Sequence, residues 1–148
     1  MSSWNPSDKS AFIVLTESNR LATVDTGNPG WAVVRGDFSK SAASANHYLE
    51  IEVDLIGSGW MAGIGKAGVN YVSADFYALA GTGVKWNSGS GTAYGSAPAQ
   101  DDIIGVLLKN GSVYFSLNGT WIAGADPVAE TGAAFTGLTG DFFPMVAM

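Results

Sequence analysis

Three acidic residues alternate with apolar ones in a short stretch of this chain, Glu50-Ile51-Glu52-Val53-Asp54. Successive side chains of a β-strand point to opposite faces, so the three carboxylates would share one face, with neighbours roughly 6.5–7 Å apart. Carboxyl groups about 5–5.5 Å apart suit retaining hydrolysis of a glycosidic bond, and groups about 6.5–9.5 Å apart suit inverting hydrolysis. The spacing therefore permits a glycoside hydrolase that uses Glu50, Glu52 and Asp54.

The same alternation has a simpler interpretation. An antiparallel sheet often has one face on the core and one in water, and charged residues on the wet face keep it soluble. The acidic stretch resembles the E-x-D-x-E or E-x-D-x-x-E strand that some concanavalin-like glycosidases use for nucleophile, helper and general acid. The hydrolase is therefore kept as an alternative, while the neighbouring segments favour a solvated face.

Other residues that could do chemistry are few. His47 is the single histidine, and no Gly-x-Ser-x-Gly elbow accompanies it; Gly57-Ser58-Gly59 is typical of a turn. Without cysteine and with one histidine, a zinc site is not expected. Asp101-Asp102 could offer oxygens to calcium, but no D-x-D-x-D-G loop surrounds them. We expect no catalytic residue, no metal and no cofactor.

Composition predicts one folded domain over residues 1–148. Hydrophobic residues make up 47% of the chain and charged residues 14%, which excludes a disordered protein. The net charge is −6, and the seven basic residues are scattered, so neither nucleic acid nor an anionic membrane is an expected partner. The first residues lack a basic segment followed by an apolar run, and no apolar stretch approaches ~18 residues. We expect synthesis in the cytoplasm and no membrane insertion.

Two Asn-Gly pairs, Asn110-Gly111 and Asn118-Gly119, predict tight hairpin turns, because both central positions of such turns need φ > 0. The chain around them should form a three-stranded meander with strands at Ile103–Lys109, Ser112–Leu117 and Thr120–Ala123.

The rest of the chain adds short strands between glycine-rich turns. One segment, Val69–Leu79, is ambiguous, and Asp75–Leu79 could be a single helical turn. The region Gly81–Pro98 should be long loops around one short strand, and Asp126–Gly137 a loop. The remaining predicted strands are Ala11–Glu17 paired with Leu21–Val24, Trp31–Arg35, His47–Ile56, Met61–Lys66 and Phe142–Ala147. This pattern is typical of an all-β antiparallel sandwich.

Five segments, in order, resemble the SPRY domain family. They are His47–Val53 (the Y-W-E-V-E-V strand), Ala62-Gly63-Ile64-Gly65 (V-G-I-A), Val84–Gly89 (K-x-x-N-G), Asp102–Gly119 (G-D-V-I-G-V-x-L-D…G-x-x-x-F-x-x-N-G) and Phe143-Pro144-Met145-Val146 (F-P-A-V). The resemblance covers most of the chain from Trp31 to Met148. It implies a concanavalin-like jelly-roll sandwich that binds peptides or proteins through loops at one edge, without a cofactor.

The chain departs from the family pattern in three places. Leu49 replaces the usual tryptophan, and Asp101 stands where a glycine commonly precedes the aspartate. A typical member also continues through another strand after the position of Met148. We therefore expect an open sheet edge at the end of the chain, which soluble proteins normally protect. Pairing of this edge with a neighbouring subunit predicts a homo-oligomer or a protein bound to a larger assembly.

Aromatic residues in the loop-rich middle of the chain are the candidate ligand-binding residues. Tryptophan and tyrosine are enriched where partners contribute most binding energy, and such rings also stack on sugars. The alternative is that these rings plug the open ends of the sandwich, as we expect Trp4, Trp31, Trp60 and Trp121 to serve in packing. The candidates are Tyr71, Phe76, Tyr77, Trp86 and Tyr94.

The segments WNPSDKSAFIVLT and GWAVVRGDFSKS resemble a bacteriophage virion subgroup of the family. The expected function is therefore a non-catalytic binding or structural module of a virion, a capsid decoration or head-surface accessory protein with phage capsid or tail proteins as partners. One alternative is a tail-associated receptor-binding protein that recognises a host surface protein or glycan. The other is the glycoside hydrolase.

Overall fold

The computed structural model describes residues 2–25, 27, 30–44, 46–54 and 59–148, and within them the chain is built almost wholly from strands. The strands are β1 (Trp4–Lys9), β2 (Ile13–Thr16), β3 (Leu21–Val24), β4 (Val33–Gly36), β5 (Lys40–Ser41), β6 (His47–Glu52), β7 (Met61–Gly65), β8 (Phe76–Ala80), β9 (Val84–Asn87), β10 (Ser90–Ala93), β11 (Ile103–Lys109), β12 (Ser112–Leu117), β13 (Thr120–Trp121) and β14 (Asp141–Ala147). No helix in the described ranges is long and apolar enough to cross a membrane.

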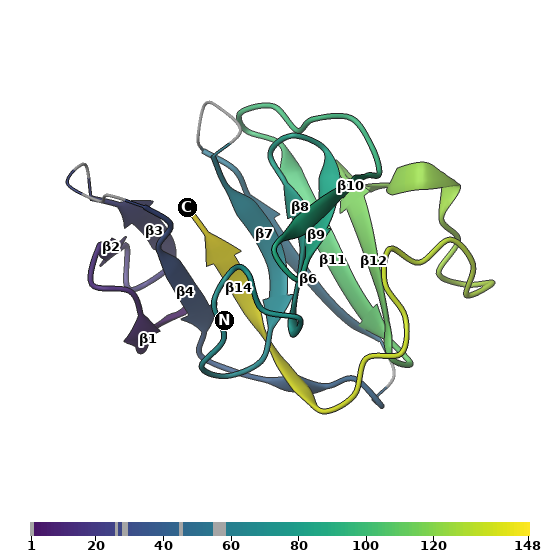
Figure 1. The fold of residues 1–148 in the computed structure, drawn as a ribbon, viewed down its shortest axis with the longest axis horizontal. Helices are drawn as coiled ribbons and strands as arrows, with labels where there is room; N and C mark the ends of the chain where they lie inside the picture. The colour runs from purple at the N-terminus through teal and green to yellow at the C-terminus, as the bar shows by residue number, and fades with distance from the viewer. Residues whose placement is uncertain (1, 26, 28–29, 45, 55–58) are drawn as a thin grey trace.

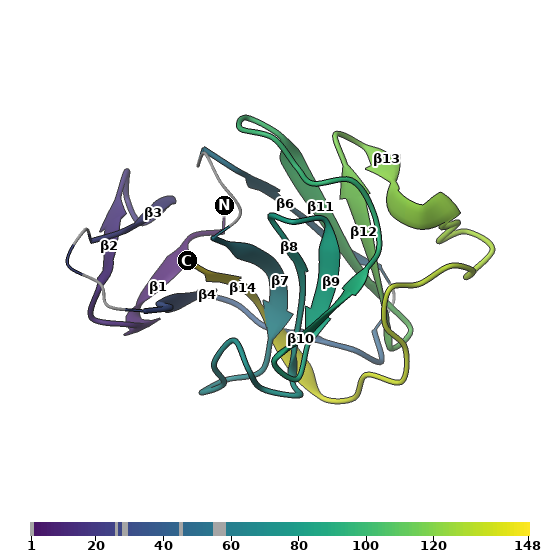
Figure 2. The ribbon, with the colours of Figure 1, turned by 45° about the horizontal axis from the view of Figure 1, so that its top comes forward.

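Two antiparallel sheets face each other (Figures 1 and 2). The larger has the order β1-β4-β14-β7-β8-β9-β10, with β5 also paired to β14, and the smaller has the order β13-β12-β11-β6. β2 and β3 form a separate hairpin, seen in purple at one side of the molecule. The predicted antiparallel sandwich is confirmed.

The core lies between the sheets and follows the alternation of the strands. Ile104 and Val106 of β11, Phe115 of β12 and Leu79 of β8 belong to one buried cluster. The outer face of the larger sheet is covered too: Phe76 is fully buried there with residues of β7 and β14. Because both of its faces are covered, β7 is buried at every position.

The Asn-Gly turns form as predicted. Asn110 and Gly111 have φ of 48° and 72°, and Asn118 and Gly119 have φ of 50° and 79°. The first two meander strands have the predicted bounds, and β3 pairs with β2 as expected. The third strand is shorter than predicted, because a 3-10 turn, Ile122–Gly124, follows Trp121.

Two local predictions were wrong. The segment considered as a helical turn forms β8. The sequence did not show this, because a short apolar run that is buried on both faces has no periodicity that distinguishes a strand from a helix. The region 81–98 holds two paired strands, β9 and β10. The first residues, for which no strand was predicted, form β1, an edge strand with a register irregularity. Pro6 is tolerated there because an edge strand lacks one row of partners. The predicted residues Leu55–Ser58 lie outside the described ones.

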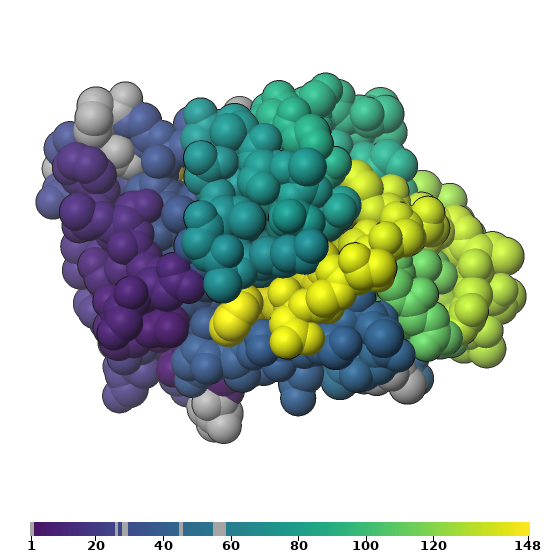
Figure 3. All heavy atoms as spheres, turned by 60° about the horizontal axis from the view of Figure 1, so that its bottom comes forward, coloured from purple at the N-terminus to yellow at the C-terminus, as the bar shows by residue number. Residues whose placement is uncertain are grey.

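The expected open edge at the end of the chain was also wrong. β14 pairs with β4 on one side and β7 on the other, and Figure 3 shows the yellow C-terminal segment between blue and teal parts of the chain. Beyond β14, Met148 exchanges two backbone hydrogen bonds with Ala32, at 2.7 and 2.9 Å. β4 thus pairs with the edge of β14 that we expected another subunit to cover. The structure therefore gives no open edge at the end of the chain as a reason for an oligomer.

Candidate functional site

β6 presents its carboxylates to solvent. Leu49 and Ile51 are half-buried on the inner face, whereas Glu50 and Glu52 are exposed on the outer face. Asp54, beyond the end of the strand, is also exposed. A glycosidase general acid needs a desolvated setting, and exposed positions do not supply one. The placement of the three acids agrees with a solvated strand face.

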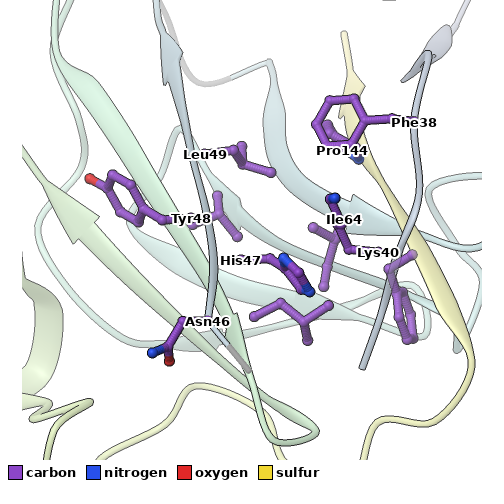
Figure 4. A pocket seen from close by; sticks show the side chains of 11 residues that line it. Phe38, Lys40, Asn46, His47, Tyr48, Leu49, Ile64 and Pro144 are labelled. Atoms are coloured by element: carbon purple, nitrogen blue, oxygen red, sulfur yellow. The ribbon is translucent and has the colours of Figure 1, made fainter. Parts of the chain in front are cut away.

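His47 points from the start of β6 into a cavity of about 190 Å³, while Tyr48 points away from it (Figure 4). The Nε2 atom of His47 is buried and has no hydrogen-bond partner among the described residues. Lys40 and Asn46 also line the cavity, but no serine or carboxylate does. A buried polar atom in such a space is suited to an ordered water, and the lining offers no Ser-His-Asp arrangement.

Asp102 is engaged in holding the fold. Its Oδ2 accepts the Ala99 N–H at 2.7 Å, and its Oδ1 accepts a hydrogen bond from Asn118 Nδ2 at 2.7 Å. These bonds, that from Asn118 first, lower the pKa of Asp102 from its ordinary value. The described residues include no group of three or more histidine or acidic side chains placed to hold a metal ion.

A groove of about 730 Å³ runs along β6 and lies next to the cavity, with which it shares Phe38, Leu49 and Pro144. Its lining combines β6, the end of β14, the start of β7 and residues of β3. It is therefore bordered by both sheets and by the separate hairpin. The sequence pattern indicated β6 but gave no sign of the groove, because the groove depends on where distant strands lie.

Three of the candidate aromatic residues pack in the interior. Phe76 is fully buried, so in this structure it is a core residue and not a contact residue. Tyr77 packs edge to face on Phe135, with ring centroids 5.1 Å apart, and Tyr94 packs edge to face on Phe115 at 6.3 Å. Burial raises the pKa of both tyrosine hydroxyls. These three rings fit the packing alternative.

The other two candidates lie together on the outside of the larger sheet. The Trp86 Nε1–H donates to the Tyr71 carbonyl at 2.7 Å, and the Tyr71 ring stacks on Trp31 with centroids 5.2 Å apart. Trp31 is 41% exposed and Val72 is 47% exposed. We call Trp31, Tyr71, Val72 and Trp86 the aromatic surface. We expected Trp31 to serve in packing. It follows a turn-rich stretch of the sequence, and residues beside turns are often exposed, so its place in the sequence could have indicated its exposure.

Comparison with known proteins shows likeness in structure alone. No protein-family model matches the chain, and no curated protein matches it in sequence. The crystal structure of the SPRY domain of human HERC1 superposes with a TM-score of 0.81 at 16% identity, covering 99% of this chain and 89% of that one. A second human SPRY domain superposes with a TM-score of 0.71 at 15% identity, covering 93% of this chain and 88% of that one. The chain therefore has the fold of SPRY domains.

Proposed function

We propose that this chain is a non-catalytic protein-binding module. The observation that carries the proposal is the aromatic surface, where the rings of Trp31 and Tyr71 stack and Trp31 remains 41% exposed. A rigid pair of large rings loses little conformational entropy on binding, and such rings are enriched among the residues that dominate interface energies. The SPRY fold supports the proposal, because the family resemblance implies peptide or protein binding without a cofactor.

We assign the contact to the outer face of the larger sheet. Of the aromatic candidates from the sequence, Tyr71 and Trp86 serve there, joined by Trp31. Tyr77 and Tyr94 serve in packing, because their rings meet other core rings. The partner is a protein, and neither nucleic acid nor a membrane is expected, because the net charge of −6 is unfavourable for both.

The proposed setting is a bacteriophage virion, in which the chain is a capsid decoration or head-surface accessory protein. The resemblance of WNPSDKSAFIVLT and GWAVVRGDFSKS to the virion subgroup supports this setting. The partners would be capsid proteins, with tail proteins as the alternative if the chain recognises a host receptor. The homo-oligomer expected from the sequence stays a prediction without a structural reason. Light scattering over micromolar concentrations tests it, and a monomer at every concentration would contradict it.

Quantitative mass spectrometry of purified virions from the source phage tests the setting. A copy number comparable with that of the major capsid protein is the expected result for a decoration protein. A much smaller number would favour the tail. Complete absence from the particle would overturn the virion setting, and binding partners would then be sought in the host cytoplasm.

A further inference from the structure

β6 is the last strand of the smaller sheet and has a partner on one side only. It pairs with β11, and no other described strand pairs with it. Next to its end, the Val53 N–H donates to the Asp102 carbonyl at 3.0 Å, and the Asp101 N–H donates to the Val53 carbonyl at 2.8 Å. The backbone groups of Val53 therefore point toward β11.

This contact fixes which backbone groups of β6 remain open. The N–H and C=O groups of successive residues point alternately to the two sides of a strand. The backbone N–H and C=O groups of Ile51 and Leu49 thus point toward β11, where these residues pair with Ile104 and Val106. The N–H and C=O groups of Tyr48, Glu50 and Glu52 face away from β11, and none of them has a backbone partner among the described residues.

The groove lies beside this open edge. Its apolar lining includes the half-buried Leu49 and Ile51 from β6, the buried Val146 from β14, and the buried Trp60 just before β7. Residues 21–23 of β3 line it as well, and β2 is the one described strand that pairs with β3. No described side chain thus fills the groove between the sheets along β6.

The charge of the groove selects its occupant. Of the charged residues in the lining, five are carboxylates and one is a cation: Glu17, Glu50, Glu52, Asp54 and Asp101 against Arg20. None of the ion pairs in the described structure includes any of these six. A surface of this sign attracts a cationic partner and repels an acidic one.

A second copy of this chain does not suit the edge. Antiparallel pairing of two β6 strands about a twofold axis would set the row of Glu50 and Glu52 against the same row of the other copy. Like charges directly opposite each other destabilise a strand pair. Exposed glutamates on an edge also discourage aggregation, but that role alone does not require an apolar groove beside them.

We propose that the open edge of β6 is a second contact, apart from the aromatic surface, and that it binds an extended, basic segment of a partner protein by β-strand addition. The proposal rests on the binding function above. The segment forms backbone hydrogen bonds with Tyr48, Glu50 and Glu52. Its alternate side chains enter the groove beside Leu49 and Ile51, so these side chains are apolar. The side chains between them lie on the outer face beside the glutamates, so they are lysine or arginine.

A synthetic peptide of alternating lysine and valine, about seven residues long so that it spans β6, is the probe. A peptide of alternating glutamate and valine is its control. We expect fluorescence anisotropy to show binding of the lysine peptide only, with an affinity that falls as salt is added. Hydrogen exchange followed by NMR should show that the amides of Glu50 and Glu52 become protected. Absence of binding, or binding without this protection, would overturn the proposal.

Glu50→Pro compared with Glu50→Gln is the decisive test, because both variants remove the charge and only proline removes an N–H on the open side while the ladder to β11 is kept. Proline is tolerated in an edge strand when its N–H side faces solvent. Loss of the hydrogen bond to the peptide should weaken binding about tenfold. Glu52→Gln should weaken it about two- to fivefold, the effect of one cross-strand charge pair. Asp141→Asn, which removes an exposed charge outside the groove, is the matched control and should change nothing.

Equal peptide affinity in wild type and Glu50→Pro would refute strand addition. If Glu50→Pro fails to fold, the exchange measurement on the wild type and the Glu52→Gln titration decide the question. Attachment to virions separates this proposal from the proposed function. If Trp31→Ala loses attachment to virions and Glu50→Pro keeps it, the binding function stands and the edge is removed from the contact with the virion. If the wild-type protein binds the lysine peptide but does not attach to virions, the proposal for the edge stands and the virion setting is overturned.

Discussion

Asp102 and Asn118 connect the start of β11 to the turn between β12 and β13. Asn118 Nδ2 donates to Asp102 Oδ1 at 2.7 Å, and Asn118 Oδ1 accepts the Ile103 N–H at 2.9 Å. The Asn118 N–H also donates to the Ile103 carbonyl at 2.9 Å. One amide side chain therefore holds the turn, with φ of 50° at Asn118, against the neighbouring strand.

We expect Asp102→Ala to destabilise the protein near neutral pH and to matter less in acid. The hydrogen bonds lower the folded-state pKa of Asp102, so the carboxylate stabilises the fold above its unfolded pKa and loses this effect as pH falls through the folded pKa. Urea denaturation at about pH 7 and about pH 2.5 measures the effect. A difference between wild type and variant that grows in acid would contradict the assigned cause.

Asp8 and Arg35 form an ion pair that joins β1 to β4. Arg35 Nε lies 2.9 Å from Asp8 Oδ2, and the side chains are 6% and 31% exposed respectively. Asp8→Ala leaves a buried guanidinium without its counter-ion, at a cost of about 2 kcal/mol in the free energy of unfolding. The double variant Asp8→Ala with Arg35→Met should be less destabilised, because the buried charge is removed as well. The single variant Arg35→Met completes the cycle, and a loss in the double variant equal to the sum of the two single losses would show that the pair is not coupled.

Gly63 allows β7 and β8 to approach each other closely. A Cβ at this position would collide with the backbone of Tyr77 and Ala78, which no side-chain rotation relieves. We expect Gly63→Ala to cost about 3 kcal/mol by overpacking. Gly59→Ala is the control, since a Cβ there meets no atom within 4 Å. Thermal denaturation of both variants tests the prediction, and a stable Gly63→Ala would contradict it.

Trp31→Ala should weaken attachment to the partner under conditions in which the variant is still folded. Trp31 is 41% exposed and its ring stacks on Tyr71, so the truncation also removes some packing within the monomer, and thermal denaturation of the variant sets the temperature of the binding assay. A central aromatic contact contributes about 2 kcal/mol or more to binding, which is roughly thirtyfold in affinity. Co-sedimentation with virions measures the loss, and Val128→Ala, at a residue 88% exposed, is the control. Unchanged attachment would remove the aromatic surface from the binding site.

The wild-type protein should not hydrolyse glycosides. Glu50, Glu52 and Asp54 are exposed along β6 and its end, and exposure does not create the different environments that acid and nucleophile need. Release of reducing ends from a panel of polysaccharides measures the activity. Turnover that is abolished by Glu50→Gln or Glu52→Gln would replace the binding function with the hydrolase.

The sequence by itself determined the elements whose signals are local. The Asn-Gly turns, the two long meander strands and the alternation in β6 follow from backbone conformations and side-chain periods within a few residues. The all-β class follows from many such signals together. The predictions failed at β8 and β10, which are short segments. Their residue pattern and composition do not distinguish a strand from a helical turn or a loop.

Only the tertiary structure decided which surfaces are free. Phe76 and Trp31 are both aromatic residues near turns, yet one is fully buried and the other is 41% exposed, because exposure depends on which distant segments cover each ring. The place of β14 between β4 and β7, and of β6 at an edge beside a groove, depends on strand order. Strand order is set by the sum of contacts between residues far apart in the chain. Local patterns in a single sequence do not show which distant residues come into contact.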